Sequence, residues 1–347
     1  MMTSESPTLQ KAHSPLVQSL RRFWSAPVSP RPLAWFRVGL ASVLLVQAFG
    51  QVGHLDGLYG CHGIVAWSVM SEQLPSGVPN LAWLETALRP LGLPAGFEVP
   101  LAFALYIGAL IGLLLGYRTR MTALLALLTH TALMMSGEMS MYGVDRFAQI
   151  GLFYCVWFPV GCALSFDKVA GRVSGVTSFE AWLGLRMLQM HVCVVYFASG
   201  VEKALGEQWW NGEAIWRAVM MMHDGLIDCS WLASVPRLAQ ILCWMTLLLE
   251  AGVILFVWHP ITRKLWLLGI IGMHLGIGLV MNLWTFSATM IVFDVAAFGV
   301  RPRTGSRKAP TAPSVPAHVA TSRETERPVR PYLQASRSAR VAESSEL

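Results

Sequence analysis

Three polar side chains recur at intervals of seven residues along one otherwise apolar stretch: Gln189, Tyr196 and Lys203. On an α-helix this spacing places them on one stripe that drifts by only about 20° per heptad. A stripe that faced lipid would leave the amide and the hydroxyl without hydrogen-bond partners. We therefore expect the stripe to face the interior of a helix bundle or a ligand cavity, and we expect chemistry within residues 181–217.

Lys203 is the sharpest candidate for a chemical role. A lysine at the mouth of an apolar cavity can lose its proton near neutral pH, because burial disfavours the charged form, and it can then act as a general base. Tyr196 and Glu202 lie near enough in the sequence to share such a catalytic site. The simpler interpretation is an interfacial lysine that reaches the headgroups and pairs with Glu207, four residues on. Spacing alone favours this simpler interpretation.

Four ionisable side chains lie well inside apolar stretches: His130, His191, Glu250 and His274. Ionisable groups within a membrane are costly and usually face the bundle interior, so each is a candidate functional residue. For a single histidine, a hydrogen bond between neighbouring helices is the simpler explanation. A carboxylate at this depth needs a partner, and we expect His274 to be the partner of Glu250.

Three further charged residues lie near the ends of apolar segments. We expect Arg37 and Arg186 to extend toward the nearer membrane surface. Asp294 needs a partner that the sequence does not identify.

Two more groups are expected on the same side of the membrane as Lys203. Asp145 and Arg146 form either a helix cap with an ion pair of little energetic weight, or part of a shared site with the lysine. Trp209 and Trp210 form either an interfacial aromatic belt or a wall against a planar lipid-soluble ligand such as a quinone. The candidate cofactor-binding residues are thus Gln189, Asp145, Arg146, Trp209 and Trp210.

The composition is that of a polytopic membrane protein. Hydrophobic residues make up 54% of the 347 residues and charged residues 13%, against about 25% charged in ordinary soluble domains. The mean hydropathy is +0.50. The six cysteines follow no CxxC or Cys/His pattern, so we expect no metal site. The sequence also lacks the P-loop, GxSxG, HExxH and dinucleotide-binding motifs.

We expect an all-α bundle of about eight membrane-spanning helices, because a span needs roughly 20 apolar residues. The expected spans are residues 33–50, 100–116, 121–135, 147–166, 183–200, 238–258, 265–281 and 284–300. Two glycine pairs, Gly112 with Gly116 and Gly272 with Gly276, predict close helix approach.

The placement of lysine and arginine predicts the orientation, since cytoplasmic loops carry an excess of both. With both termini in the cytoplasm, the inner loops carry most of these residues, and Lys203 lies outside. We expect a multi-pass protein of the cell inner membrane, with the site facing the periplasm or exterior. Cys61 and Cys229 would then both lie in an oxidising compartment, where a disulfide is chemically allowed although the sequence does not indicate that they meet.

Two polar segments flank the predicted transmembrane domain of residues 33–300. Residues 1–32 form a polar cytoplasmic arm, and residues 301–347 form a basic cytoplasmic tail with too few large apolar residues to fold. Attraction to anionic lipid explains the basic tail more simply than nucleic-acid binding does, because almost no aromatic residues interrupt it.

An ordered set of short elements runs through the chain. The elements are WFRVGL at 35–40, LDGLYGCHG at 55–63, YRTR at 117–120, YGVDRFAQIGLF at 142–153, SFD at 165–167, YFASGVEKALGEQWWNG at 196–212, and His274 followed by FSATMIVFD at 286–294. With this set, residues 32–300 resemble the HTTM family, the horizontally transferred transmembrane domain that is shared with vitamin K-dependent gamma-glutamyl carboxylase. No single element is specific, but the ordered set is.

The resemblance implies a role for Lys203 and a reduced naphthoquinone as cofactor. In the carboxylase the matching lysine, in a similar YFxxGxxK pattern, is taken as the base that deprotonates vitamin K hydroquinone. Oxygen then converts the quinol into a strong base, which removes a proton from a substrate glutamate before carbon dioxide adds. That site faces the lumen, which corresponds to the side expected here for Lys203.

Two departures leave other functions open. The chain lacks the large lumenal substrate-binding domain of the carboxylase, and Asp145 and Arg146 stand where the carboxylase has a histidine-containing segment. The sequence is therefore compatible with a carboxylase-like enzyme that acts on a small secreted peptide or protein. The alternative, which the sequence favours almost as strongly, is a non-enzymatic membrane factor for maturation or export of such a peptide. A transporter with Glu250 and His274 as a proton relay is weaker, because no inverted repeat is evident.

Overall fold

The computed structural model describes residues 27–60, 63, 77–94, 96–137, 141–221 and 227–301. All of them belong to the first of two compact units, Met1–Gly305. Most of these residues are helical, and the pairing of Val28 with Ser178 is the only β-bridge among them. The predictions for residues 1–26 of the arm, for residues 302–347 of the tail and for Cys61 lie outside the described residues, so the disulfide between Cys61 and Cys229 stays a prediction.

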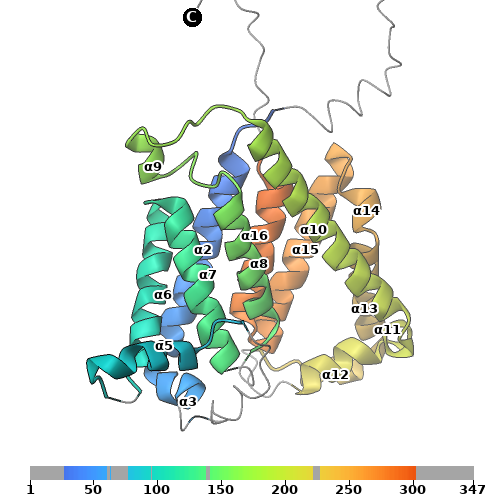
Figure 1. Cartoon of the computed structure of the whole chain (residues 1–347). Helices are drawn as coiled ribbons and strands as arrows, with labels where there is room; N and C mark the ends of the chain where they lie inside the picture. The colour runs from blue at the N-terminus through green and yellow to red at the C-terminus, as the bar shows by residue number, and fades with distance from the viewer. Residues whose placement is uncertain are drawn as a thin grey trace, which may run out of the picture. The chain divides into compact units, whose positions relative to one another are not determined.

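Among the described residues, a helical rod overlaps each segment that we predicted as a span (Figure 1). The bounds of these rods are α2 (Arg31–Gln51), α6 (Glu98–Leu115), α7 (Thr119–Ser136), α8 (Gly143–Trp157), α10 (Phe179–Ala204), α13 (Pro236–Ala251) continued by α14 (Val253–Phe256), α15 (Pro260–Met281), and α16 (Trp284–Asp294) continued by the π-helical η5 (Val295–Gly299). Because α8 ends at Trp157, the predicted span 147–166 is too long.

Four described stretches are long and apolar enough to cross a membrane: Arg31–Tyr59, Glu98–Leu115, Phe179–Ala204 and Pro260–Met281. Trp284–Gly299 is a shorter apolar helix. The prediction of an all-α membrane protein is therefore confirmed in its coarse form, an all-helical bundle with four candidate spans.

Short helices gather at the ends of the bundle (Figure 1). At the lower end lie η1 (Val52–His54), α3 (Leu55–Tyr59), α5 (Leu81–Leu88), η2 (Arg89–Leu91), α11 (Glu207–Asn211), α12 (Glu213–Met221) and η4 (Ser230–Ser234), whereas α9 (Phe166–Val169) lies at the upper end. We call these the α11 end and the α9 end.

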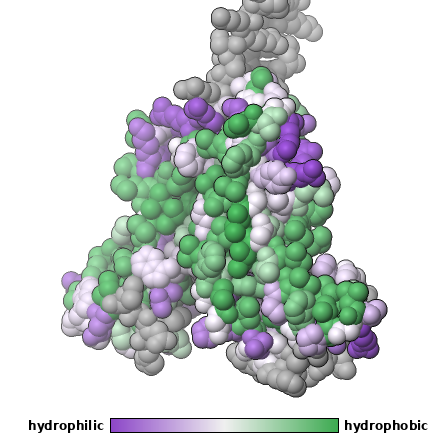
Figure 2. Space-filling view, turned by 90° about the vertical axis from the view of Figure 1, so that its left-hand side faces the viewer, coloured by the Kyte–Doolittle hydropathy of each residue, from purple (hydrophilic) through white to green (hydrophobic). Residues whose placement is uncertain are grey.

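The sides of the bundle are covered with apolar side chains. Large hydrophobic residues such as Val46, Met187, Val194 and Leu268 are exposed along the helices. Figure 2 shows the resulting hydrophobic belt, with hydrophilic residues gathered above and below it. Soluble monomers rarely expose apolar patches of this extent, so the belt indicates a surface that faces lipid.

Glycines allow close helix contact in some of the predicted places. A Cβ at Gly112 would lie 2.6 Å from Thr122 Cγ2, so α6 and α7 pack tightly there. The prediction for Gly272 and Gly276 is wrong, because a Cβ at either would meet nothing within 4 Å. A close backbone approach between two helices instead involves Gly200, whose Cβ would lie 2.4 Å from the backbone nitrogen of Ala251, and this joins α10 to α13.

Arg37 does not extend to the membrane surface as predicted. Its side chain is fully buried, and its guanidinium donates to the backbone oxygens of Leu113, at 2.7 Å, and of Leu164. The last carbonyls of a helix have no hydrogen-bond partner within the helix. A buried cation at that end donates hydrogen bonds to these carbonyls and interacts favourably with the negative end of the helix dipole. Arg37 therefore closes the end of α6.

Candidate functional site

The polar stripe of α10 faces the bundle interior. Gln189 and Tyr196 are 7% and 3% exposed, and the side chain of Lys203 is 24% exposed. This orientation agrees with the seven-residue spacing. Ser178 begins the helix by accepting a hydrogen bond from the backbone nitrogen of Ala181, at 3.0 Å, so one continuous helix of 26 residues positions all three side chains.

Lys203 binds a buried carboxylate on a neighbouring helix. Its Nζ lies 2.8 Å from Glu250 Oε2, and it also donates to Ser199 Oγ. The ring of Trp209 covers it, with a distance of 5.4 Å from Nζ to the ring centroid. The simpler interpretation of Lys203, a pair with Glu207, is not what forms, and the partner that we expected for Glu250, His274, is replaced by the lysine. A carboxylate buried in a low-dielectric region is stabilised best by a full opposite charge.

A second cluster lies two turns earlier on α10. The hydroxyl of Tyr196 lies 2.7 Å from His274 Nε2 and donates to Asp294 Oδ2 at 2.8 Å. Since the single hydrogen of the hydroxyl goes to Asp294, His274 donates from Nε2, and in a neutral imidazole Nδ1 then carries no hydrogen. Tyr196 is thus the partner that the sequence did not identify for Asp294.

Two atoms of this cluster remain unsatisfied. Within the described part of the chain, neither Asp294 Oδ1 nor His274 Nδ1 has a hydrogen-bond partner, although both are buried. Buried polar atoms without a partner are rare in folded proteins and occur where a ligand, an ordered water or a proton binds. The cluster can therefore accept a proton or a hydrogen-bond donor.

Gln189 and His191 connect helices rather than join these clusters. Gln189 donates to the backbone oxygen of Ala297 in η5 at 2.7 Å and accepts from Arg186, also at 2.7 Å. Arg186 is thus half-buried against the stripe. His191 Nδ1 lies 2.7 Å from the hydroxyl of Tyr154, which ties α10 to α8.

Asp145 and Arg146 separate from each other. Asp145 caps α8 by accepting from the backbone nitrogen of Tyr142 at 3.0 Å, and it also accepts from Gln47 at 3.0 Å. Arg146 is exposed and its nearest polar partner is Gln149, at 3.5 Å. Among the described residues no hydrogen bond or ion pair joins either of them to Lys203, so the geometry matches the helix-cap alternative.

The residues that follow Lys203 have different roles. Trp210 is exposed, and its backbone oxygen accepts from Gln240, at 2.9 Å, and from Trp244, at 3.1 Å, which holds α11 against α13. Glu202 is exposed and makes no hydrogen bond or ion pair within the described part of the chain. Of the predicted aromatic wall, only Trp209 lies beside the lysine.

Sequence reasoning missed Ser199, which is bonded to Lys203. The signal was present, because a residue four positions earlier on a helix lies on the same face. The structure also contains a cavity of about 670 Å³, but it lies at the α9 end, and none of the predicted site residues lines it.

The candidate residues that the structure brings together are thus Lys203, Ser199 and Glu250 in one cluster, and Tyr196, His274 and Asp294 in the other. No protein-family model matches the chain, and searches of curated proteins and of solved structures find no similar protein.

Proposed function

We propose that the chain crosses the cell inner membrane eight times with both termini in the cytoplasm. The distribution of basic residues on the helix ends supports this orientation. At the α9 end lie Arg31, Arg118, Arg120, Lys168, Arg172, Arg263, Lys264 and Arg301, and at the α11 end lie Arg89, Arg146, Lys203, Arg217 and Arg237. The α9 end would then be cytoplasmic, and Lys203 would face the periplasm or exterior.

We further propose that the protein is a membrane enzyme of the HTTM type that uses a reduced naphthoquinone in a carboxylase-like reaction on a small secreted peptide. The observation that supports this most is the half-buried Lys203, bonded to Glu250 and followed along α10 by a cluster with two unsatisfied buried atoms. A quinol fits this donor set, because it is a flat apolar ring with hydroxyl groups. Trp209 offers the ring a face, and Lys203 together with the Tyr196 cluster offers polar atoms.

The residues would divide the proton transfer between them. Lys203 in its neutral form accepts a proton from an acidic hydroxyl, and Glu250, 2.8 Å away, takes the proton that Lys203 must first release. Tyr196 keeps His274 and Asp294 in place beside the pair. A quinol, when bound, would supply the acidic hydroxyl and the reducing equivalents.

The test is an assay of the full-length protein in lipid nanodiscs with reduced naphthoquinone and oxygen. Quinone products would be followed by absorbance and mass spectrometry for the wild type, Lys203→Ala and Glu250→Gln. Lys264→Ala is the matched control, because this lysine is exposed on α15. We expect turnover by the wild type and the control and a loss of at least about 100-fold in both site variants. Equal product formation by folded Lys203→Ala would refute the role of the lysine.

One observation favours the alternative, a non-enzymatic factor for maturation or export of a small secreted peptide. Lys203 is fully engaged by Glu250 and Ser199, as a structural clamp between α10 and α13 would be. A clamp can be replaced by apolar side chains of similar size, whereas a base cannot. In a strain that depends on the protein for secretion of its peptide, the double variant Lys203→Met and Glu250→Leu would keep secretion if the pair is a clamp and abolish it if the pair is catalytic.

A further inference from the structure

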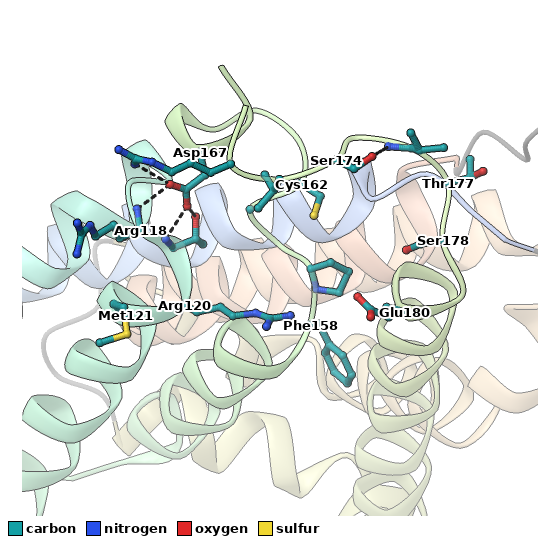
Figure 3. A pocket seen from close by; sticks show the side chains of 16 residues that line it. Arg118, Arg120, Met121, Phe158, Cys162, Asp167, Ser174, Thr177, Ser178 and Glu180 are labelled. Carbon is teal, nitrogen blue, oxygen red and sulfur yellow. Dashed lines mark hydrogen bonds and ion pairs between the residues drawn. The ribbon is translucent and has the colours of Figure 1, made fainter. Parts of the chain in front are cut away.

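A cavity of about 670 Å³ opens at the α9 end of the bundle. The first turn of α7, the segment of residues 158–162, the loop of residues 167–178 and the first turn of α10 surround it (Figure 3). Three arginines line it: Arg118, Arg120 and Arg172. We call it the arginine cavity.

The acid nearest to these arginines is already neutralised. Asp167 accepts hydrogen bonds from the backbone nitrogens of Arg118, at 2.9 Å, and Thr119, at 2.7 Å, and pairs with Arg172 at 3.3 Å. Glu180 is the other acid in the lining, and Figure 3 shows it opposite Arg120. No ion pair within 4.0 Å joins these two side chains. Three cations therefore face two carboxylates, one of which is fully used.

One arginine side chain inside the cavity remains available to a ligand. Among the described residues, the guanidinium groups of Arg118 and Arg120 make no hydrogen bond or ion pair. Figure 3 shows that of Arg120 inside the cavity, beside Phe158, and that of Arg118 turned away from it. A guanidinium presents several donors in one plane, which suits bidentate hydrogen bonding to the oxygens of a phosphate group.

Most of the remaining lining surface is apolar, although Thr119, Ser174, Thr177 and Ser178 also line the cavity. Met121, Phe158, Pro159, Val173 and Val176 form the walls, so the cavity combines a cationic group with a hydrophobic surface. Basic pockets between membrane helices on the cytoplasmic side are suited to lipid headgroups. A free inorganic anion would leave the apolar walls in contact with water.

We propose that the arginine cavity binds a phosphate ester, with Arg120 as its principal contact and the apolar walls against the adjoining hydrocarbon of an anionic phospholipid. A soluble phosphate ester is the other source of the same chemistry. This binding site is separate from the Lys203 pair and does not depend on its function.

The experiment uses full-length protein in neutral detergent with added lipid, and native mass spectrometry measures the bound fraction. The ligands are phosphatidylglycerol, phosphatidylcholine and, as the soluble arm, glycerol 3-phosphate. The proteins are the wild type, Arg120→Gln, Arg118→Gln with Arg120→Gln, and Glu180→Gln. Lys264→Gln is the control, because it removes one positive charge from an exposed side chain that does not line the cavity.

We expect the wild type and Lys264→Gln to bind phosphatidylglycerol about tenfold more tightly than phosphatidylcholine. Arg120→Gln and the double variant should lose most of this preference, and Glu180→Gln should increase it because a repelling carboxylate is removed. If glycerol 3-phosphate binds as tightly as the lipid and also depends on Arg120, the phosphate site stands with a soluble ligand. Equal binding by the double variant and the control would overturn the proposal, and thermal unfolding of each variant verifies that it is folded.

Discussion

At the residue scale, Tyr196 holds two ionisable side chains from two other helices with one hydroxyl. We predict that Tyr196→Phe destabilises the protein by about 1–3 kcal/mol, because it leaves His274 and Asp294 buried without this partner. Thermal unfolding in detergent would measure the loss. Glu202→Gln, which changes an exposed side chain six positions on, should leave the unfolding temperature unchanged. An unchanged temperature for Tyr196→Phe would contradict the hydrogen bonds described for it.

The Lys203–Glu250 pair predicts a strong coupling between two residues. Removing either partner leaves a charge in a poorly solvated place, which typically costs about 3–5 kcal/mol, whereas removing both leaves none. Lys203→Met and Glu250→Leu should therefore each destabilise the protein more than the double variant does. A double-mutant cycle on the unfolding free energies checks this, and additive effects would mean that the two side chains do not interact.

Asp167 predicts a dependence of stability on pH. Burial raises the pKa of its carboxyl, but the hydrogen bonds from Thr119 and Arg118 and the contact with Arg172 outweigh burial and bring the pKa below its ordinary value of 3.8. When the pKa of a carboxyl is lower in the folded state than in the unfolded state, its ionised form stabilises the fold. This stabilisation is complete above the pKa of the unfolded state, and it is lost as the pH falls through the pKa of the folded state. Asp167→Asn should be less stable than the wild type at neutral pH, and the difference should shrink as the pH falls below the ordinary carboxyl pKa and through the lowered pKa of the folded state. The prediction would be contradicted if the unfolding free energies of the wild type and of Asp167→Asn changed with pH in parallel.

At the scale of helices, the contact between α10 and α13 depends on the missing side chain of Gly200. A larger residue would collide with the backbone of Ala251, and overpacking of this kind typically costs about 1–3 kcal/mol. We predict that Gly200→Leu lowers stability and separates Lys203 from Glu250. Gly272→Leu on α15 is the control, since a Cβ there meets nothing within 4 Å. Equal stability of the two variants in a thermal unfolding assay would disprove the close approach.

The helices themselves were predictable, but their partners were not. Apolar length and the seven-residue spacing on α10 were enough to place the rods and to orient Tyr196 and Lys203. The choice of Lys203 as the partner of Glu250, and of Tyr196 as the partner of Asp294, depends on how helices distant in sequence pack. The prediction of close helix approach at Gly272 and Gly276 of α15 failed for a related reason. Two glycines spaced four residues apart leave a smooth helix surface, but they do not specify that another helix covers it. The prediction that Arg37 reaches the membrane surface failed because the residues near it in the sequence do not indicate that the end of α6 lies beside it.

At the scale of the whole molecule, the proposed orientation predicts which residues a membrane-impermeant maleimide can reach. In a background with Cys61→Ser and Cys229→Ser, Gln208→Cys in α11 should be labelled on cells whose outer membrane is permeable. Lys264→Cys at the start of α15 should be labelled only after the inner membrane is opened. Both original side chains are exposed, so folding should tolerate the changes. The reverse labelling pattern would invert the orientation and place the Lys203 pair in the cytoplasm.

In the proposed eight-span topology, the length of α8, 15 residues, has a consequence for the surrounding lipid. At 1.5 Å per residue, α8 covers about 22 Å, whereas a typical hydrocarbon layer is about 30 Å thick. A bilayer adapts to a short span by thinning locally, and the cost grows with each ångström of mismatch. The protein should thus unfold at a higher temperature in nanodiscs of short-chain lipids than in those of long-chain lipids, and in a cell it would be sorted toward the thinner regions of its membrane.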